Sequence, residues 1–271
     1  MTDPILYTHK ARKRFGQNFL HDRNIIDRIV KSIPTNNKNP LIEIGPGLGA
    51  LTASLFEINP EMAAIEIDRD LATQLRERFP RLMLIEGDAL KVNIDDIIKK
   101  MGATTPAIDK AIIIGNLPYN ISTPLIFHLL ESRNTIASMY FMLQKEVVDR
   151  MAAAPGNKDY GKLSVMVQYY CNVSPLFHIS PQCFQPVPKV DSTFVLLKPR
   201  PFQITALDQS HFEKLVSHAF QQRRKTLRNA IRPLLPPEIP AAVLPRLTQR
   251  AEEISVAEFV EMSNHLCKVI F

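Results

Sequence analysis

Apolar residues fall in short continuous runs along the first half of the chain, and helical patterns separate these runs. The runs cover residues 41–44, 62–67, 82–85, 111–114 and 136–143. Their lengths are those of buried strands. Between them apolar residues recur at helical spacing, as Leu71, Leu75 and Phe79 do. This alternation predicts a doubly wound, Rossmann-like α/β fold with a mostly parallel sheet covered on both faces.

The pattern changes in the second half of the chain. Residues 163–198 predict further strands around a proline-rich loop at 181–188, and Pro199-Arg200-Pro201 reads as a boundary. Beyond it, helical patterns run over residues 212–219, 227–235 and 256–269. We therefore expect a large α/β domain, residues 1–200, and a small all-helical domain, residues 201–271.

Composition narrows the class of protein. The chain has 271 residues, of which 45% are hydrophobic and 22% charged, so a large core is available. The net charge of +6 is compatible with a nucleic acid partner. The cysteines, 171, 183 and 267, form no C-x-x-C pair, and the histidines show no metal-ligand spacing. We expect no metal, no membrane partner and a monomer in the cytoplasm.

Three glycines follow the first apolar run, at Gly45, Gly47 and Gly49. Glycine at this turn permits unusual backbone angles and keeps side chains away from a ligand. No Lys-Ser/Thr pair follows, so the loop is not a P-loop. Glu66 lies at the end of the strand predicted next, 21 residues after Gly45, and can accept hydrogen bonds from ribose hydroxyls. A dinucleotide site is the natural competitor, and a turn without a ligand is the plainer alternative.

Asp88 follows the third run, in Glu86-Gly87-Asp88-Ala89. A carboxylate there could accept a hydrogen bond from the amino group of an adenine held at the edge of the sheet. Taken singly, Asp88 is a helix cap or a turn residue. Its position, one strand beyond Glu66 and in line with the glycine loop, favours the ligand.

The fourth run ends in Asn116-Leu117-Pro118-Tyr119. The side-chain oxygen of Asn116 and the backbone carbonyl of Leu117 could accept the two protons of an adenine N6 amino group. Pro118 fixes the turn, and Tyr119 can stack on the base. An ordinary turn is the alternative for an isolated tetrapeptide. After the glycine loop and the two acids, the tetrapeptide predicts methyl transfer to an amino group on a base.

At this point the chain resembles a known family, the bacterial small-subunit (16S) ribosomal RNA adenine N6,N6-dimethyltransferases of the kasugamycin-resistance type. The resemblance spans nearly the whole chain. The matching blocks are residues 16–20, 45–49, 66–68, 87–89, 116–124, 142–147, 160–165, 186–192 and 220–229. The family implies a class I methyltransferase fold, with S-adenosylmethionine as methyl donor. It also implies that the large domain is catalytic and that the helical one binds RNA.

The resemblance also implies residue roles. The cofactor would be held by Asn18, Leu20, Gly45, Gly47, Glu66, Asp88 and Asn116. The residues at the target base would be Asn116, Leu117, Tyr119 and Phe184, with the two aromatic rings on either side of a flipped-out adenine. The implied product is dimethyladenosine at two adjacent positions near the 3′ end of the 16S RNA, made during biogenesis of the small ribosomal subunit.

Basic residues gather at Arg223, Arg224, Lys225 and Arg228, with Arg232 nearby. The functional interpretation is contact with RNA phosphates; the alternative is a solvated helix face. Two other functions stay open beside the main one. The first is a large-subunit RNA adenine methylase, which shares the cofactor and base loops. The second is a non-catalytic ribosome assembly factor. A dehydrogenase comes third.

Overall fold

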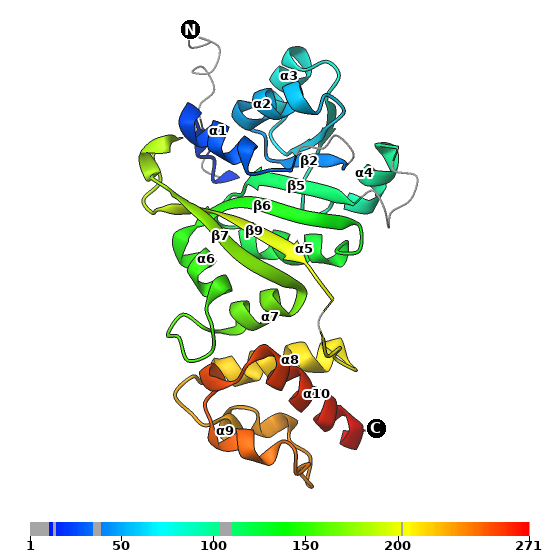
Figure 1. Cartoon of the computed structure of the whole chain (residues 1–271), viewed down its shortest axis with the longest axis vertical. Helices are drawn as coiled ribbons and strands as arrows, with labels where there is room; N and C mark the ends of the chain where they lie inside the picture. Colours follow the sequence, from blue (N-terminus) through cyan, green and yellow to red (C-terminus); the bar gives the residue numbers. More distant parts are fainter. Residues whose placement is uncertain (1–10, 13–14, 35–38, 103–109, 202, 271) are drawn as a thin grey trace. The chain divides into compact units, whose positions relative to one another are not determined.

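The computed structural model describes residues 11–12, 15–34, 39–102, 110–201 and 203–270. The chain forms two compact units, and Figure 1 shows their elements. The first unit contains the chain up to Lys145 and the returning segment Ser174–Pro199. The second contains Glu146–Val173 and the chain from Arg200 onwards.

A seven-stranded sheet is the frame of the α/β part. Its order is β4 (Met83–Glu86), β3 (Ala63–Glu66), β2 (Leu41–Ile44), β5 (Ala111–Asn116), β6 (Ile136–Gln144), β9 (Ser192–Pro199) and β7 (Cys171–Ile179). Strands β4 to β6 are parallel to one another, and β9 runs antiparallel to β6. The apolar runs in the sequence therefore correspond to the parallel strands, as predicted.

The direction of the chain through the sheet reverses between β2 and β5. From β2 the chain moves outward through β3 and β4, and it then returns to β5 and continues to β6 on the other side. The register places Ile44 beside Gly115. A Cβ atom at Gly115 would lie 2.5 Å from the carbonyl oxygen of Ile44, so only glycine allows this approach. The carboxyl ends of β2 and β5 thus border the crevice in which such sheets bind ligands.

Helices cover both faces of this sheet. They are α1 (Arg23–Lys31), α2 (Ala50–Ile58), α3 (Arg69–Arg78), α4 (Ile94–Lys100) and α5 (Ser122–Glu131). Ile29 of α1, Leu55 of α2 and Leu75 of α3 join one buried cluster with Ile112 and Ile114 of β5. The chain crosses the sheet from β4 to β5, and connections between parallel strands are right-handed as a rule, which places α4 and α5 on the opposite face. The sheet is therefore buried on both sides, and its loops remain for the ligand.

A short second sheet lies at the N-terminal end of the described chain. Strand β1 (Phe19–Leu20) pairs antiparallel with β8 (Phe184–Gln185), and Leu20 lies opposite Phe184. A 3-10 helix at Pro181–Cys183 precedes β8. This pairing ties the N-terminal segment to the proline-rich loop region, which no local sequence pattern indicated.

The second unit is helical. Its α-helices are α6 (Lys145–Ala152), α7 (Lys162–Tyr170), α8 (Gln209–Gln221), α9 (Leu227–Ala230) and α10 (Val256–Ile270), with 3-10 helices at Arg232–Leu234, Leu244–Thr248 and Ala251–Glu253. The rings of Tyr160, Phe220 and Phe259 pack in a row, with centroids 6.0 and 5.8 Å apart. The Tyr160 hydroxyl donates to the carbonyl oxygen of Ile254, 2.9 Å away. The sequence predicts a boundary at residue 200 and places residues 146–173 in the first domain, whereas contacts group Glu146–Val173 with the helical unit.

Two expectations about local structure were wrong. Residues 162–170 form helix α7 and not a strand. The prediction failed because most residues from Ser164 to Tyr170 are buried, so their hydrophobicity shows no period that distinguishes a helix from a strand. The helix expected over 227–235 stops at Ala230, since Pro233 lacks the amide that would continue it. Among the described helices, none combines the length and the apolar character needed to cross a membrane.

Candidate active site

A hollow of about 970 Å³, counting its open mouth, lies at the carboxyl ends of β2, β3, β4 and β5. Residues 15–20, which we call the N-terminal strap, form one wall. The predicted site residues that line the hollow are Asn18, Leu20, Gly45, Gly47, Glu66, Asp88, Asn116, Leu117 and Tyr119. The structure thus brings together nine predicted residues from five separate parts of the sequence.

Gly45 gives the hollow its floor beside β2. Its φ angle is +67°, a backbone conformation that residues with a side chain rarely adopt. A Cβ atom built there would meet nothing closer than the backbone oxygen of Asn116, 4.0 Å away. A side chain at this position would therefore project into the space that a ligand needs.

Glu66 connects the end of β3 to the glycine loop. Its Oε2 accepts a hydrogen bond from the Gly47 amide at 3.0 Å, and its Oε1 accepts from the Asp68 amide at 2.9 Å. Burial raises the pKa of Glu66, and these two backbone hydrogen bonds partly oppose the rise. Each carboxylate oxygen can accept a second bond. Glu66 can therefore shape the loop and still receive a ligand hydroxyl.

Glu43 is a second carboxyl group beneath the same loop, and the sequence reasoning gave it no role. It is buried in β2 and accepts a hydrogen bond from the Thr52 hydroxyl at 2.7 Å. Burial raises the pKa of Glu43 to about 7; the Thr52 bond lowers it, and the neighbouring charge of Glu66 raises it further. An acid inside an apolar strand, directly before a glycine loop, was the signal that could have revealed it.

The charges around the hollow all have one sign. Glu43, Glu66 and Asp88 line it, and none of its described lining residues is Lys, Arg or His. Asp88 accepts a hydrogen bond from the Leu90 amide at 3.0 Å, as a turn residue does, and keeps further acceptor capacity. Such a lining suits a ligand with a positive charge and several hydroxyl or amino donors. It suits the diphosphate of a dinucleotide poorly.

Asn116 stands at the end of β5, where the strap meets the sheet. Its Nδ2 donates to the backbone oxygen of Asn18, 2.7 Å away. Only the amide nitrogen can donate to a carbonyl, so the partner fixes the orientation of the carboxamide and leaves its oxygen as an acceptor. Residue 116 therefore lies at the hollow beside the glycine turn, with a preorganised neutral acceptor.

The two predicted stacking rings differ in position. Tyr119 lines the hollow, and its hydroxyl lies 2.9 Å from that of Ser192. Burial raises the pKa of Tyr119, so the ring stays a neutral phenol. Phe184 is 1% exposed, packs in the core cluster with Leu20 and Phe194, and is not part of the lining of the hollow. The structure does not bring Phe184 to the ligand space, and its role stays a prediction.

The predicted RNA-contact residues are exposed in the second unit. Arg224 and Lys225 lie in the turn after α8, and Arg228 lies on α9. Arg223, in the same turn, donates to the backbone oxygens of Lys158 at 2.8 Å and Tyr160 at 3.1 Å. It also pairs with the carboxylate of Glu252, at 3.3 Å. Arg223 therefore holds a neighbouring turn in place, which the sequence did not reveal.

The chain is similar to known proteins over nearly its whole length. A family model described as ribosomal RNA adenine dimethylase matches residues 8–268. Two similar proteins are both named ribosomal RNA small subunit methyltransferase A. The one from Pseudomonas aeruginosa is 48% identical, and the alignment covers 97% of each chain. The one from Saccharophagus degradans is 49% identical, and the alignment covers 98% of this chain and 97% of the relative.

Solved structures agree with the fold. A dimethyladenosine transferase from Plasmodium falciparum aligns with a TM-score of 0.73 and 25% identity, covering 90% of this chain and 95% of its own. The 23S rRNA methyltransferase ErmE aligns with a TM-score of 0.66 and 24% identity, covering 91% and 100%. Both carry the same arrangement of sheet and helices, and the second likeness concerns the fold alone.

Proposed function

This chain belongs to the ribosomal RNA adenine dimethylase family, and from that premise we propose that it dimethylates N6 of two adjacent adenosines near the 3′ end of the small-subunit RNA. It is a methyltransferase that uses S-adenosylmethionine. We further propose that its partner is the small ribosomal subunit and that the residues of the hollow have the roles that follow from their positions. The relatives named above, at 48 and 49% identity over nearly their full lengths, support the small-subunit substrate.

One observation carries the proposed chemistry. Asn116 lines the same hollow as Gly45 and Glu66, and the backbone oxygen of Asn18 fixes its carboxamide with the oxygen left as an acceptor. A carboxamide oxygen and a peptide oxygen together can receive both protons of an N6 amine. This would hold the amine in line and disperse the positive charge that develops on it, which preorganised dipoles do well in a site shielded from water.

The residues around the hollow fit the methyl donor. When bound, S-adenosylmethionine supplies a methyl group on a positively charged sulfur, and the carboxylate-lined hollow complements that charge. We assign Asn18 and Leu20 to the methionine side and Gly45 with Gly47 to the floor. Glu66 would accept the ribose hydroxyls and Asp88 the adenine amino group.

The target base would enter beside β5. Leu117 contributes its backbone oxygen, and Tyr119 offers an uncharged ring for stacking, which is worth about 1–3 kcal/mol per base. Holding the two reactants in alignment can itself lower the barrier by about 7–11 kcal/mol. Phe184 would cover the other side of the base only after leaving its place in the core beside Leu20. Arg224, Lys225 and Arg228, and the structurally engaged Arg223, would contact RNA phosphates.

The test uses purified small and large ribosomal subunits that lack the modification. Each is incubated with the protein and labelled S-adenosylmethionine, and the RNA is digested and analysed by mass. Two adjacent dimethyladenosines in the small-subunit RNA alone are expected. Label in the large-subunit RNA would show the other methylase activity and overturn the assignment.

The Asn116→Ala variant separates catalysis from an assembly function. It should bind small subunits like the parent, yet lose about 10²–10³-fold in methylation rate, the usual effect of removing one preorganised hydrogen-bonding group. A variant that still makes the normal amount of product would contradict the role of Asn116. If the parent chain binds subunits without making product, the protein is a binding factor.

A further inference from the structure

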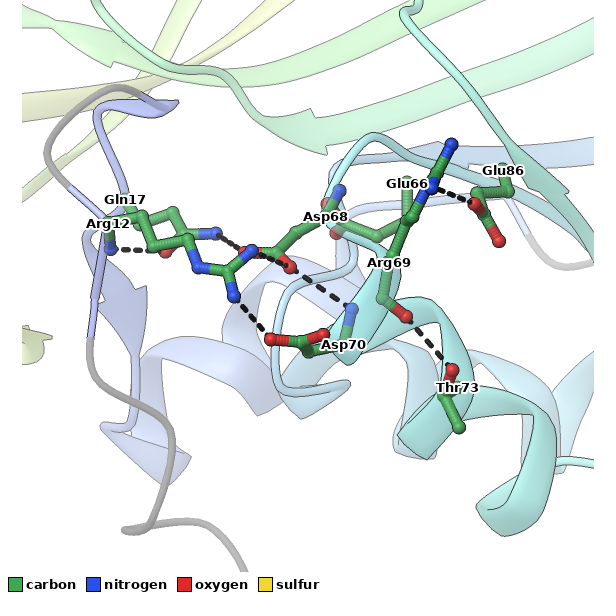
Figure 2. A network of polar contacts seen from close by, with 8 residues as sticks. All are labelled: Arg12, Gln17, Glu66, Asp68, Arg69, Asp70, Thr73 and Glu86. Carbon is green, nitrogen blue, oxygen red and sulfur yellow. Dashed lines mark hydrogen bonds and ion pairs between the residues drawn. The ribbon is translucent and has the colours of Figure 1, made fainter.

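Arg12 reaches across from the N-terminal part of the chain to the start of α3. Its guanidinium donates to Asp68 Oδ1 at 2.8 Å and pairs with the carboxylate of Asp70 (Figure 2). The side chain of Asp68 is fully buried, whereas that of Arg12 is 34% exposed. A buried carboxylate needs such a partner, because removing a charge from water without one is costly.

Gln17, a residue of the strap, also binds Asp68. Its Nε2 donates to Asp68 Oδ2 at 3.1 Å, and its Oε1 accepts from the Arg12 backbone amide at 2.7 Å. Arg12 and Gln17 therefore occupy both oxygens of Asp68 and also bind each other, as Figure 2 shows. Gln17 lines the hollow, and Arg12 does not.

The contacts continue from Asp68 into the cofactor site. The Asp68 amide donates to Glu66 Oε1, and Glu66 Oε2 accepts from the amide of Gly47. The next strap residue, Asn18, accepts a hydrogen bond at its backbone oxygen from Asn116. The adjacent residues Gln17 and Asn18 thus attach the strap to the β3–α3 turn and to the end of β5, and both line the hollow.

We propose that Arg12 is a positioning residue for the methyl donor, and that its pair with Asp68 holds the strap as a closed wall of the cofactor site. The inference rests on the proposed function, because it takes the hollow to be the S-adenosylmethionine site. Arg12 acts through the groups that it holds, since it does not itself line the hollow. When the pair is absent, the strap is closed in a smaller fraction of molecules, and the apparent Kd rises by the inverse of that fraction.

The main variant is Arg12→Ala, and its matched control is Arg76→Ala. Arg76 lies on α3 and pairs with the carboxylate of Glu86 at 3.2 Å, so the control loses an arginine and a more exposed ion pair that does not involve the strap. Arg12→Lys keeps the charge but lacks the fork that spans Asp68 and Asp70. Gln17→Ala breaks the same attachment without a change in charge, and it serves if Arg12→Ala folds poorly.

Equilibrium dialysis measures the Kd for labelled S-adenosylmethionine, and steady-state assays on small subunits give KM and kcat. If the strap is closed in about one tenth of the Arg12→Ala molecules, the Kd and KM of this variant for the donor should rise about tenfold. At saturating donor, kcat should stay within about twofold of the parent. Amide exchange should quicken in residues 15–20. Arg12→Lys should fall in between, and Arg76→Ala should match the parent.

Two results would overturn the inference. One is a donor Kd for both Arg12→Ala and Gln17→Ala within twofold of the parent. The other is a fall in kcat with unchanged Kd. Either leaves the proposed function standing, because the parent still binds and uses the donor. A parent chain that fails to bind S-adenosylmethionine at all would instead remove the proposed function, and this inference with it.

Discussion

The hydroxyl of Tyr119 lies 2.9 Å from the hydroxyl of Ser192, a residue of β9 that is 1% exposed. This bond joins the loop after β5 to an antiparallel strand 73 residues later in the chain. It holds the edge of the ring, and the faces of the ring do not take part in it. The bond and the ring can therefore be tested separately.

Tyr119→Phe keeps the ring and removes the bond. We expect a loss of about 1 kcal/mol in unfolding free energy, because the buried Ser192 hydroxyl loses its partner, and a small change in methylation. Tyr119→Ala removes the stacking surface, so kcat/KM for small subunits should fall roughly 5- to 150-fold, the equivalent of about 1–3 kcal/mol. Equal losses in the two variants, measured by initial rates, would show that the ring does not stack on the base.

Glu43 predicts a pH-dependent stability. Its pKa in the folded protein is about 7, above the ordinary 4.5, so between these values the folded state binds more protons than the unfolded chain. Stability must then fall as pH rises through this window. Glu43→Gln removes the cost of burying an ionised carboxylate. It should raise the free energy of unfolding by up to about 3 kcal/mol above pH 7, with little gain below pH 4.5.

Urea unfolding of parent and Glu43→Gln between pH 4.5 and 8, without cofactor, measures this difference. Glu57→Gln, at an exposed position on the neighbouring α2, is the control for the loss of a carboxylate as such. If the curves for Glu43→Gln and the parent run parallel over the whole range, the buried carboxyl does not titrate as described.

The basic turn after α8 divides into cations that hold the fold and cations that face solvent. Arg224→Ala with Lys225→Ala should weaken subunit binding and reduce the slope of log K against log salt by about 0.7–0.9 for each RNA phosphate that the variant no longer neutralises. Arg223→Ala should mainly lower the thermal midpoint, because its side chain holds Lys158, Tyr160 and Glu252. An unchanged midpoint in Arg223→Ala, with a reduced salt slope, would make Arg223 an RNA-binding residue like its neighbours.

Local patterns of apolar residues were sufficient to predict the parallel strands of the α/β sheet. Each predicted apolar run became a parallel strand, and the loops that follow β2 and β5 meet at one edge, because carboxyl ends of parallel strands must. Asn116 could therefore be placed near Gly45 from the sequence alone. The same reasoning put Glu66 and Asp88 beside them, and all four line the hollow.

Long-range contacts escaped prediction. The pair of Arg12 with Asp68 joins residues 56 positions apart, and no spacing rule connects them. The burial of Phe184 follows from its pairing opposite Leu20, which also has no local signal. Helix α7 was missed because buried residues on most sides erase the period that tells a helix from a strand. The role of Phe184 was predicted from the family resemblance alone, and a resemblance in sequence does not show whether the side chain is exposed.

The second unit is assembled from two stretches of chain, Glu146–Val173 and the part from Arg200 onwards, while Ser174–Pro199 between them belongs to the first unit. During synthesis, the rings of Tyr160 and Phe220 emerge well before Phe259 of α10 completes their row. The nascent protein therefore carries uncovered apolar helices until α10 leaves the ribosome. A chain cut short before α10 would leave that surface permanently bare, although every catalytic loop had already been made.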